Sequence, residues 1–320
     1  MIETFMAALP HGITLSCRAA GPSPGPRVML LHGFPEAAFA WDGVMSALAL
    51  QARCIAPNLR GFERSSAPAD IEAYRARHLM QDLEALILHT GGPVDLLVAH
   101  DWGGAVAWNL AAMRPELMRR LLIINSPHPA TFVRELRSNP AQQAASAYMN
   151  FLCRPDAEAL LAENDFARLW PFFERMGGRS WLDEAMRARY REMWSMGLTG
   201  GLNLYRASPL RPPSAADPSV AQALHAVQLP DTLTTSRVPT SVLWGEGDHA
   251  LLPCLLDGLE RWVPDLQLTR VPEASHWIVH EQPQRVVGEI RRCLGLGPMY
   301  LGITSAPRGS TGLVFFIGRP

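Results

Sequence analysis

An aspartate stands at the centre of a short run that is typical of a nucleophile turn. Asp101 lies between the apolar segment 94–99, which favours a buried strand, and the small-residue segment 105–113, which favours a helix. Small residues on either side let such a turn pack closely and expose its central side chain. A carboxylate there can displace a leaving group from saturated carbon and form an alkyl-enzyme ester, whereas an esterase would carry serine. The alternative is that Asp101 only caps the helix.

A histidine and a second acid follow in the chain order of a catalytic triad. Asp248 comes soon after the strand-like run 239–244, and His276 follows one further strand near 266–271. Nucleophile, acid and histidine succeed one another in this order when the nucleophile lies on a strand-turn-helix elbow. We therefore expect His276, oriented by Asp248, to activate the water that hydrolyses the ester.

Two backbone N–H groups near the turn are candidates for an oxyanion hole. The segment 32–35 ends the strand-like run 28–31 with glycine and proline. A loop in this place supplies one donor, and the residue after the nucleophile supplies the other. We expect the N–H groups of Phe34 and Trp102 to be these donors.

Four segments carry a resemblance to a known family. They are similar to the soluble epoxide hydrolases of the α/β-hydrolase fold, and the resemblance spans about residues 10–295. It implies a mostly parallel central sheet with flanking helices and an inserted helical cap. The segment from His100 to Gly104 is fairly specific to this family, and the other three also occur in haloalkane and fluoroacetate dehalogenases. The segments are His32 to Glu36, Arg60 to Phe62, His100 to Gly104 and Ser275 to Trp277.

The same resemblance indicates which residues would donate a proton to the epoxide oxygen when the ring opens. An epoxide oxygen leaves as an alkoxide and needs a proton, and a tyrosine hydroxyl with a pKa of about 10 is a neutral donor at pH 7. Tyr148 and Tyr205 look like the family's first and second cap tyrosines. The function that follows is hydrolysis of an epoxide to a vicinal diol. Tyr190 matches no such position and is interpreted as a packing aromatic.

Two other functions stay open. A haloalkane or haloacid dehalogenase would use the same Asp101 nucleophile. Fluoroacetate dehalogenases, however, place an arginine where this chain has Trp102, and their acid usually stands where it has Asn125. Haloalkane dehalogenases often place a halide-binding asparagine where this chain has Phe34, although the indole of Trp102 would suit a halide. The second alternative is a member that binds a small ligand without turnover, but such receptors usually keep a serine nucleophile.

Alternating strand-like and helical runs would position these residues. The runs 28–31, 53–57, 94–99 and 121–124 alternate with helical stretches, which favours βαβ units and a parallel sheet. Strand-like runs then cease, and aromatic-rich helical segments take their place. We expect four regions: a first core part at 1–128, a helical cap (lid) at 129–236, a second core part at 237–296, and an atypical, loosely packed or disordered tail at 297–320.

The composition excludes several classes of function. The 320 residues carry a net charge of −1, which gives no electrostatic footprint for nucleic acid. All 29 basic residues are arginine, so lysine Schiff-base chemistry and a P-loop lysine are excluded. The five cysteines lack metal-ligand spacing, and we expect neither a metal nor an organic cofactor. Without a run of about 18 apolar residues, no membrane span is expected. We expect a cytoplasmic monomer or homodimer whose substrate is a small apolar epoxide.

Overall fold

A mostly parallel sheet forms the centre of the computed structural model, which describes residues 1–175 and 181–297. Its strands are β1 (Glu3–Ala8), β2 (Thr14–Ala20), β3 (Arg27–Leu31), β4 (Arg53–Pro57), β5 (Leu96–His100), β6 (Leu121–Ile124), β7 (Thr240–Gly245) and β8 (Leu266–Val271). They lie in the order β1-β2-β4-β3-β5-β6-β7-β8. Strand β2 is antiparallel to both its neighbours, and the six strands from β4 to β8 in that order are parallel. The predicted fold class is thereby confirmed.

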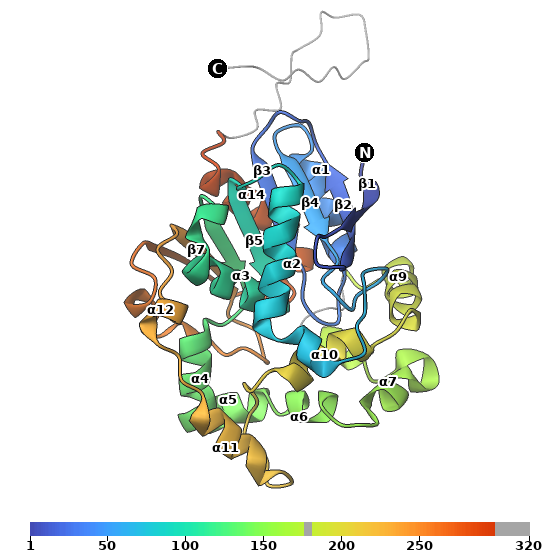
Figure 1. Cartoon of the computed structure of the whole chain (residues 1–320), viewed down its shortest axis with the longest axis vertical. Coiled ribbons are helices and arrows are strands. Elements are labelled where there is room, and N and C mark those ends of the chain that lie inside the picture. The colour runs from blue at the N-terminus through green and yellow to red at the C-terminus, as the bar shows by residue number, and fades with distance from the viewer. Residues whose placement is uncertain (176–180, 298–320) are drawn as a thin grey trace, which may run out of the picture.

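Helices cover both faces of the sheet, because successive strand residues point to opposite sides. In β5, Leu97 and Ala99 belong to the core cluster that also holds the apolar side of two helices drawn in front of the sheet. Leu96 and Val98 belong to the cluster on the other face. Burial on both faces explains why this strand is apolar throughout. The front helices are α2 (Ala76–His89) and α3 (Trp102–Met113), and those of the other face are α1 (Asp42–Leu48) and α14 (Pro283–Cys293), with the short α13 (Ile278–Glu281) before it (Figure 1).

The described residues between β6 and β7 form helices, which we call the cap helices. They gather at one end of the sheet, below it in Figure 1. Two of them return toward the core, where α10 packs beside residues 71–74 and α12 packs on α3. The cap helices are α4 (Pro129–Ser138), α5 (Pro140–Ala145), α6 (Tyr148–Leu152), α7 (Ala157–Phe166), α8 (Trp170–Glu174), α9 (Glu184–Ser195), α10 (Thr199–Ala207), α11 (Pro218–Ala226) and α12 (Asp231–Thr234).

Three parts of the structure differ from the sequence pattern or lie beyond it. Strands β1 and β2 were not indicated by an apolar run, because β1 is largely exposed and β2 mixes polar with apolar residues. The stretch 209–219, which is rich in proline, serine and alanine, lies outside helices except at its end, where Pro218 begins α11. Of the tail expected at 297–320, all but the first residue lies outside the described residues.

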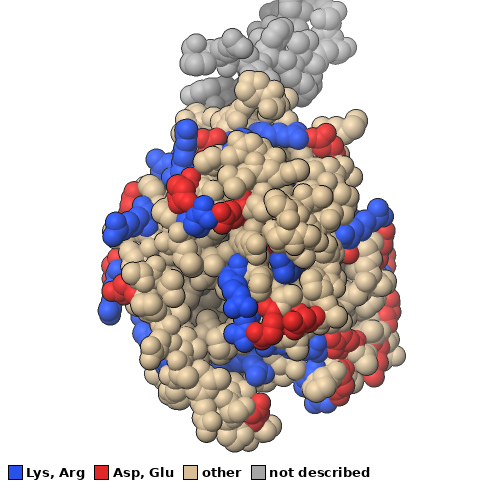
Figure 2. Space-filling model, in the orientation of Figure 1, with Lys and Arg blue, Asp and Glu red and all other residues tan. Residues whose placement is uncertain are grey.

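The surface carries both signs of charge. Figure 2 shows arginine and acidic side chains interspersed with uncharged residues on the visible face. Many of these charges are paired, as Arg75 is with Glu72 beside the start of α2. Within residues 1–175 and 181–297, no helix combines the length and the apolar character needed to cross a bilayer.

One histidine joins the two connections between the core and the cap helices. His128 Nδ1 accepts a hydrogen bond from the N–H of Ala130 at the start of α4, at 3.3 Å. Its Nε2–H donates to the carbonyl of Thr234 in α12, at 2.9 Å. The buried ring stacks on Trp262 and meets the edge of Trp108. The bond that Nδ1 accepts requires the neutral ring, and burial lowers the pKa of His128 to about 4.

We expect the contribution of His128 to stability to disappear in acid. Because the folded pKa lies below the unfolded value of about 6.5, this stability is present above pH 6.5 and is lost as pH falls toward 4. The gap in the free energy of unfolding between wild type and His128→Gln should shrink by up to about 3 kcal/mol between pH 7 and pH 4. Urea unfolding at several pH values measures this gap, and a gap independent of pH would contradict the account.

Candidate active site

Asp101 occupies a strained turn between β5 and α3. Its backbone has φ 51° and ψ −121°, a conformation that residues other than glycine rarely adopt. Helix α3 begins at the next residue, but the Asp101 side chain makes no capping bond to it. Its Oδ1 instead accepts a hydrogen bond from the N–H of Phe34 at 2.8 Å. The carboxylate therefore points across to the loop after β3, and the helix-cap interpretation of Asp101 is wrong.

Two glycines allow this turn to pack closely. A Cβ on Gly33 would lie 2.1 Å from Oδ1 of Asp101, and a Cβ on Gly104 would lie 2.3 Å from the Ser126 side chain. Ser126 donates from its hydroxyl to the Asp101 carbonyl at 2.7 Å and so fixes the turn from the β6 side. A side chain at position 33 would displace the aspartate from Phe34, and one at position 104 would displace Ser126.

The histidine and the second acid meet beside the nucleophile. His276 Nδ1 lies 2.6 Å from Oδ2 of Asp248, and His276 Nε2 lies 3.9 Å from Oδ2 of Asp101. The other oxygen of Asp248 accepts from the N–H groups of Ala250 and Leu251, both at 2.8 Å. This arrangement orients the imidazole so that Nε2 faces the carboxylate of Asp101.

Charges set the protonation of this pair. Burial alone would lower the pKa of His276, but the carboxylates of Asp248, Asp101 and Glu36 together raise it to about 9. Burial alone would raise the pKa of Asp248, but the charge and hydrogen bond of His276 keep it below its ordinary value. The side chains of both residues are buried, so water screens their attraction little. The histidine is consequently protonated and Asp248 is ionised at neutral pH.

The two predicted cap tyrosines lie together over Asp101. Tyr148 begins α6 and Tyr205 belongs to α10, and their ring centroids are 6.2 Å apart. Tyr205 also meets the Trp102 ring edge-on at 4.9 Å. Burial, followed by the nearby charge of Asp101, raises the pKa of Tyr148 well above its usual value. Burial likewise raises the pKa of Tyr205, so both hydroxyls stay protonated and can donate.

One of the two predicted oxyanion donors contacts the carboxylate. The N–H of Phe34 already binds one carboxylate oxygen. Trp102 is the first residue of α3, and the first N–H groups of a helix have no acceptor within it. The part played by the Trp102 N–H stays a prediction.

A buried polar cluster behind the turn was not found from the sequence. Glu36 is 1% exposed and accepts hydrogen bonds from Tyr190 of α9 at 2.8 Å and from His280 at 2.5 Å. Its other oxygen lies 3.3 Å from Nδ1 of His100, whose Nε2 donates to the carbonyl of His276. Although burial raises the pKa of Glu36, the two histidines hold it well below its ordinary value. Tyr190 therefore donates a hydrogen bond to the Glu36 carboxylate, in addition to the packing role that the sequence indicated.

Asn125 is a second residue whose place the sequence did not explain. It follows β6, and its amide nitrogen donates to Oδ2 of Asp248 at 2.9 Å. It also exchanges hydrogen bonds with the backbone of Gly245 at the end of β7. The sequence could have indicated that Asn125 belongs to the site, because it stands at the carboxyl end of the strand next to β7. The carboxyl ends of parallel strands meet at one edge of the sheet.

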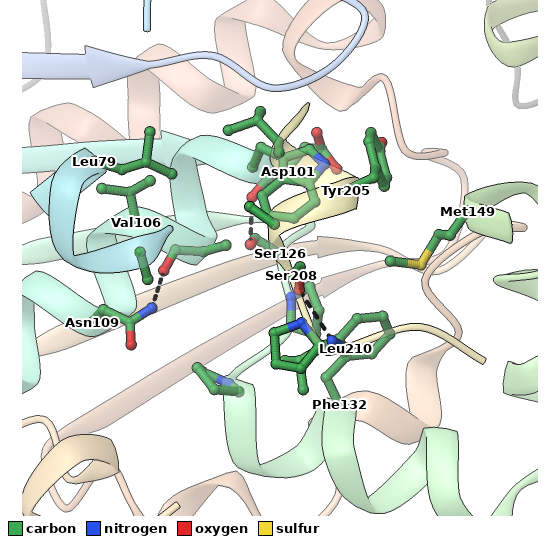
Figure 3. Close-up of a pocket in the computed structure, with 18 of the residues that line it drawn as sticks. Leu79, Asp101, Val106, Asn109, Ser126, Phe132, Met149, Tyr205, Ser208 and Leu210 are labelled. Carbon is green, nitrogen blue, oxygen red and sulfur yellow. Dashed lines mark hydrogen bonds between the residues drawn. The ribbon is translucent and has the colours of Figure 1, made fainter. Parts of the chain in front are cut away.

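A cavity of about 240 Å³ opens in front of the nucleophile, between α3 and the cap helices. Figure 3 shows Asp101 and Tyr205 close together, with Phe132, Met149 and Leu210 on the cap side. Most of the lining is apolar, which suits a hydrophobic ligand held by a few polar groups.

Comparisons with known proteins identify similar chains. The model of the alpha/beta hydrolase fold family matches residues 26–283. The AB hydrolase superfamily protein YfhM of Bacillus subtilis is 37% identical over 277 residues, which cover 85% of this chain and 91% of that protein. Epoxide hydrolase 3 of Xenopus tropicalis is 32% identical over 289 residues, which cover 88% and 74%. The crystal structure of Bacillus megaterium epoxide hydrolase in complex with an inhibitor aligns at a TM-score of 0.82 and 28% identity, covering 91% of this chain and 100% of that one.

The strain at Asp101 can be measured by comparing two substitutions. Both Asp101→Gly and Asp101→Ala remove the carboxylate and its bond to Phe34, but only glycine adopts the observed backbone conformation without strain. We expect the glycine variant to be more stable than the alanine variant by about 1 kcal/mol or more. Denaturant unfolding gives the difference, with loss of turnover in both variants as the control. Equal stabilities would mean that the turn is unstrained.

Proposed function

Because this chain belongs to the epoxide hydrolase family within the α/β-hydrolase fold, we propose that it opens an epoxide to a vicinal diol through an ester on Asp101. It is a hydrolase that acts on ether bonds. The observation that carries the mechanism is the placing of a carboxylate, where an esterase has serine, beneath two protonated tyrosines. The proposed nucleophile and acids line one cavity, and the proposed base lies directly beside it.

In the first step a carboxylate oxygen of Asp101 attacks one carbon of the epoxide. Oδ1 is held by Phe34, so Oδ2 is the oxygen free to attack. The new bond from oxygen to carbon forms as the bond from the ring oxygen to the same carbon breaks. The leaving oxygen takes a proton from the hydroxyl of Tyr148 or Tyr205. The product is an alkyl ester that carries a hydroxyl on the neighbouring carbon.

In the second step water hydrolyses that ester. Esterification removes the negative charge of Asp101, which is one of the charges that raise the pKa of His276. The imidazolium then releases its proton more readily, and this proton restores the hydroxyl of the tyrosine that was deprotonated in the first step. The neutral ring can then accept a proton from water. The resulting hydroxide attacks the carboxyl carbon of Asp101. The N–H groups of Phe34 and Trp102 hold the oxyanion, each donor being worth roughly 3 kcal/mol in other hydrolases. Collapse releases the diol, which takes its proton from His276, and the proton left on the carboxyl group of Asp101 then passes to the histidine.

We expect the two tyrosines to be required for epoxides and dispensable for halides. Wild type should convert styrene oxide to its diol, and the Tyr148→Phe/Tyr205→Phe variant should do so about a hundredfold more slowly or worse, because the alkoxide then leaves without an acid. Diol formation is followed beside bromide release from 1-bromobutane.

The other outcomes of that assay are equally definite. Asp101→Ala should lose diol formation altogether, and full activity in this variant would exclude the scheme. Bromide release that survives in the double variant, without diol formation in wild type, would make the chain a dehalogenase. No turnover of either compound would favour the ligand-binding alternative.

The ester itself should accumulate when the base is removed. In His276→Gln, mass spectrometry should find the substrate's mass added to the protein, because esterification proceeds and hydrolysis does not. In wild type, the rate of ester breakdown should rise with pH and level off at a pH below about 9, because esterified Asp101 no longer raises the pKa of His276. Rapid-quench measurements across pH test this. A rate that rises only above pH 9, or no adduct in His276→Gln, would contradict the two-step mechanism.

A further inference from the structure

The cavity follows one face of helix α3 away from the nucleophile. Trp102, Ala105, Val106 and Asn109 all line it, at the spacing of residues that share a helical face. A helix rises by 1.5 Å per residue, so the lined face extends about 12 Å from Asp101 to Asn109. Figure 3 shows Asn109 beside Val106 and Leu79, well apart from Asp101 and Tyr205. A ligand that reacts at Asp101 and follows this wall is therefore elongated.

The walls offer no partner for a charged ligand. Among the described residues that line the cavity, Asp101 is the only acidic or basic side chain apart from the tyrosines. A carboxylate on the ligand would lose its hydration there without gaining a counterion, and it would also be repelled by Asp101. The body of the ligand meets apolar side chains such as Phe132, Leu210 and Val227.

Asn109 supplies an unused polar group at the far end of this wall. Its Nδ2 donates to the carbonyl of Ala105 at 2.7 Å, and this bond fixes which way the amide points. Its Oδ1 has no protein partner within the described residues, and the side chain is half-buried at the cavity wall. The amide can thus accept one hydrogen bond from a ligand and donate its second N–H to the same group.

We propose that the site selects an uncharged, elongated epoxide with a hydroxyl-like group at its far end, and that Asn109 is the residue that recognises this group. This inference rests on the proposed function, because it takes Asp101 as the position of the epoxide. It adds a specificity-determining residue and a substrate class, namely neutral epoxides with a distant hydrogen-bonding group.

Three matched terminal epoxides test the proposal: a ten-carbon epoxyalkane, the same epoxide with a hydroxyl on the last carbon, and the same with a carboxylic acid there. Wild type should prefer the alcohol, by kcat/KM, and should turn over the acid least. In Asn109→Leu the preference for the alcohol over the alkane should fall by about tenfold, because the hydroxyl loses its partner. Turnover of the alkane by this variant is the control for correct folding.

A positive charge at position 109 should reverse the discrimination against the acid. Asn109→Arg should raise kcat/KM for the acid by about tenfold or more relative to the alkane, because the guanidinium supplies the missing counterion. Asn109→Asp keeps an acceptor for the alcohol and should reject the acid further.

The possible failures can be told apart. If none of the three epoxides is turned over by wild type, the proposed function fails. If all are turned over but the ratios between them are the same in wild type, Asn109→Leu and Asn109→Arg, the epoxide hydrolysis stands and the assignment of Asn109 is overturned.

Discussion

The turn at Asp101 imposes the constraint on which the other parts of the site depend. Its positive φ turns the carboxylate away from α3 and toward the loop after β3, where the N–H of Phe34 holds one oxygen. In the proposed mechanism, this bond leaves Oδ2 to attack and makes Oδ1 the oxygen that becomes the oxyanion. The close contacts at Gly33 and the hydroxyl of Ser126 leave the turn little freedom to relax. The strain is maintained because β3, β5 and β6 are buried and meet at this edge.

The cap helices complete a site that the sheet alone would leave open. The sheet edge supplies a nucleophile and a base, but the proton donors Tyr148 and Tyr205 come from α6 and α10. The cap helices are also fastened near the nucleophile, because Tyr190 bonds to Glu36 and Trp194 donates to the carbonyl of Pro35. A shift of α9 would therefore be transmitted to the loop that contains Phe34. Helix α9 and the loop that supplies the proposed oxyanion donor are thus coupled through these two bonds.

The sequence predicted the site residues that follow a local pattern. It missed the residues whose bonding partners lie far away along the chain. Asp101 and Asp248 each follow a buried strand and His276 follows β8, so strand order brings them to one edge. Tyr148 and Tyr205 could not be placed by periodicity, and only a family resemblance indicated them. Glu36 and Tyr190 are separated by 154 residues, and a buried ion bonded over that span leaves no local pattern. Strands β1 and β2 were missed for another reason, because β1 is largely exposed and β2 mixes polar with apolar residues.

The distribution of charge around Asp101 explains how one site can first attack an apolar molecule and then bind water. On the cavity side the walls are apolar, and the tyrosines stay neutral because burial raises their pKa. On the opposite side His276, Asp248, Glu36 and His100 form a buried ionic cluster. The carboxylate of Asp101 lies between the apolar cavity walls and the ionic cluster. Under the proposed mechanism, an ester on Asp101 would remove one negative charge that faces His276 and would thereby lower the pKa of the histidine. The ester formed in the first step would in this way prepare His276 to act as the base in the second.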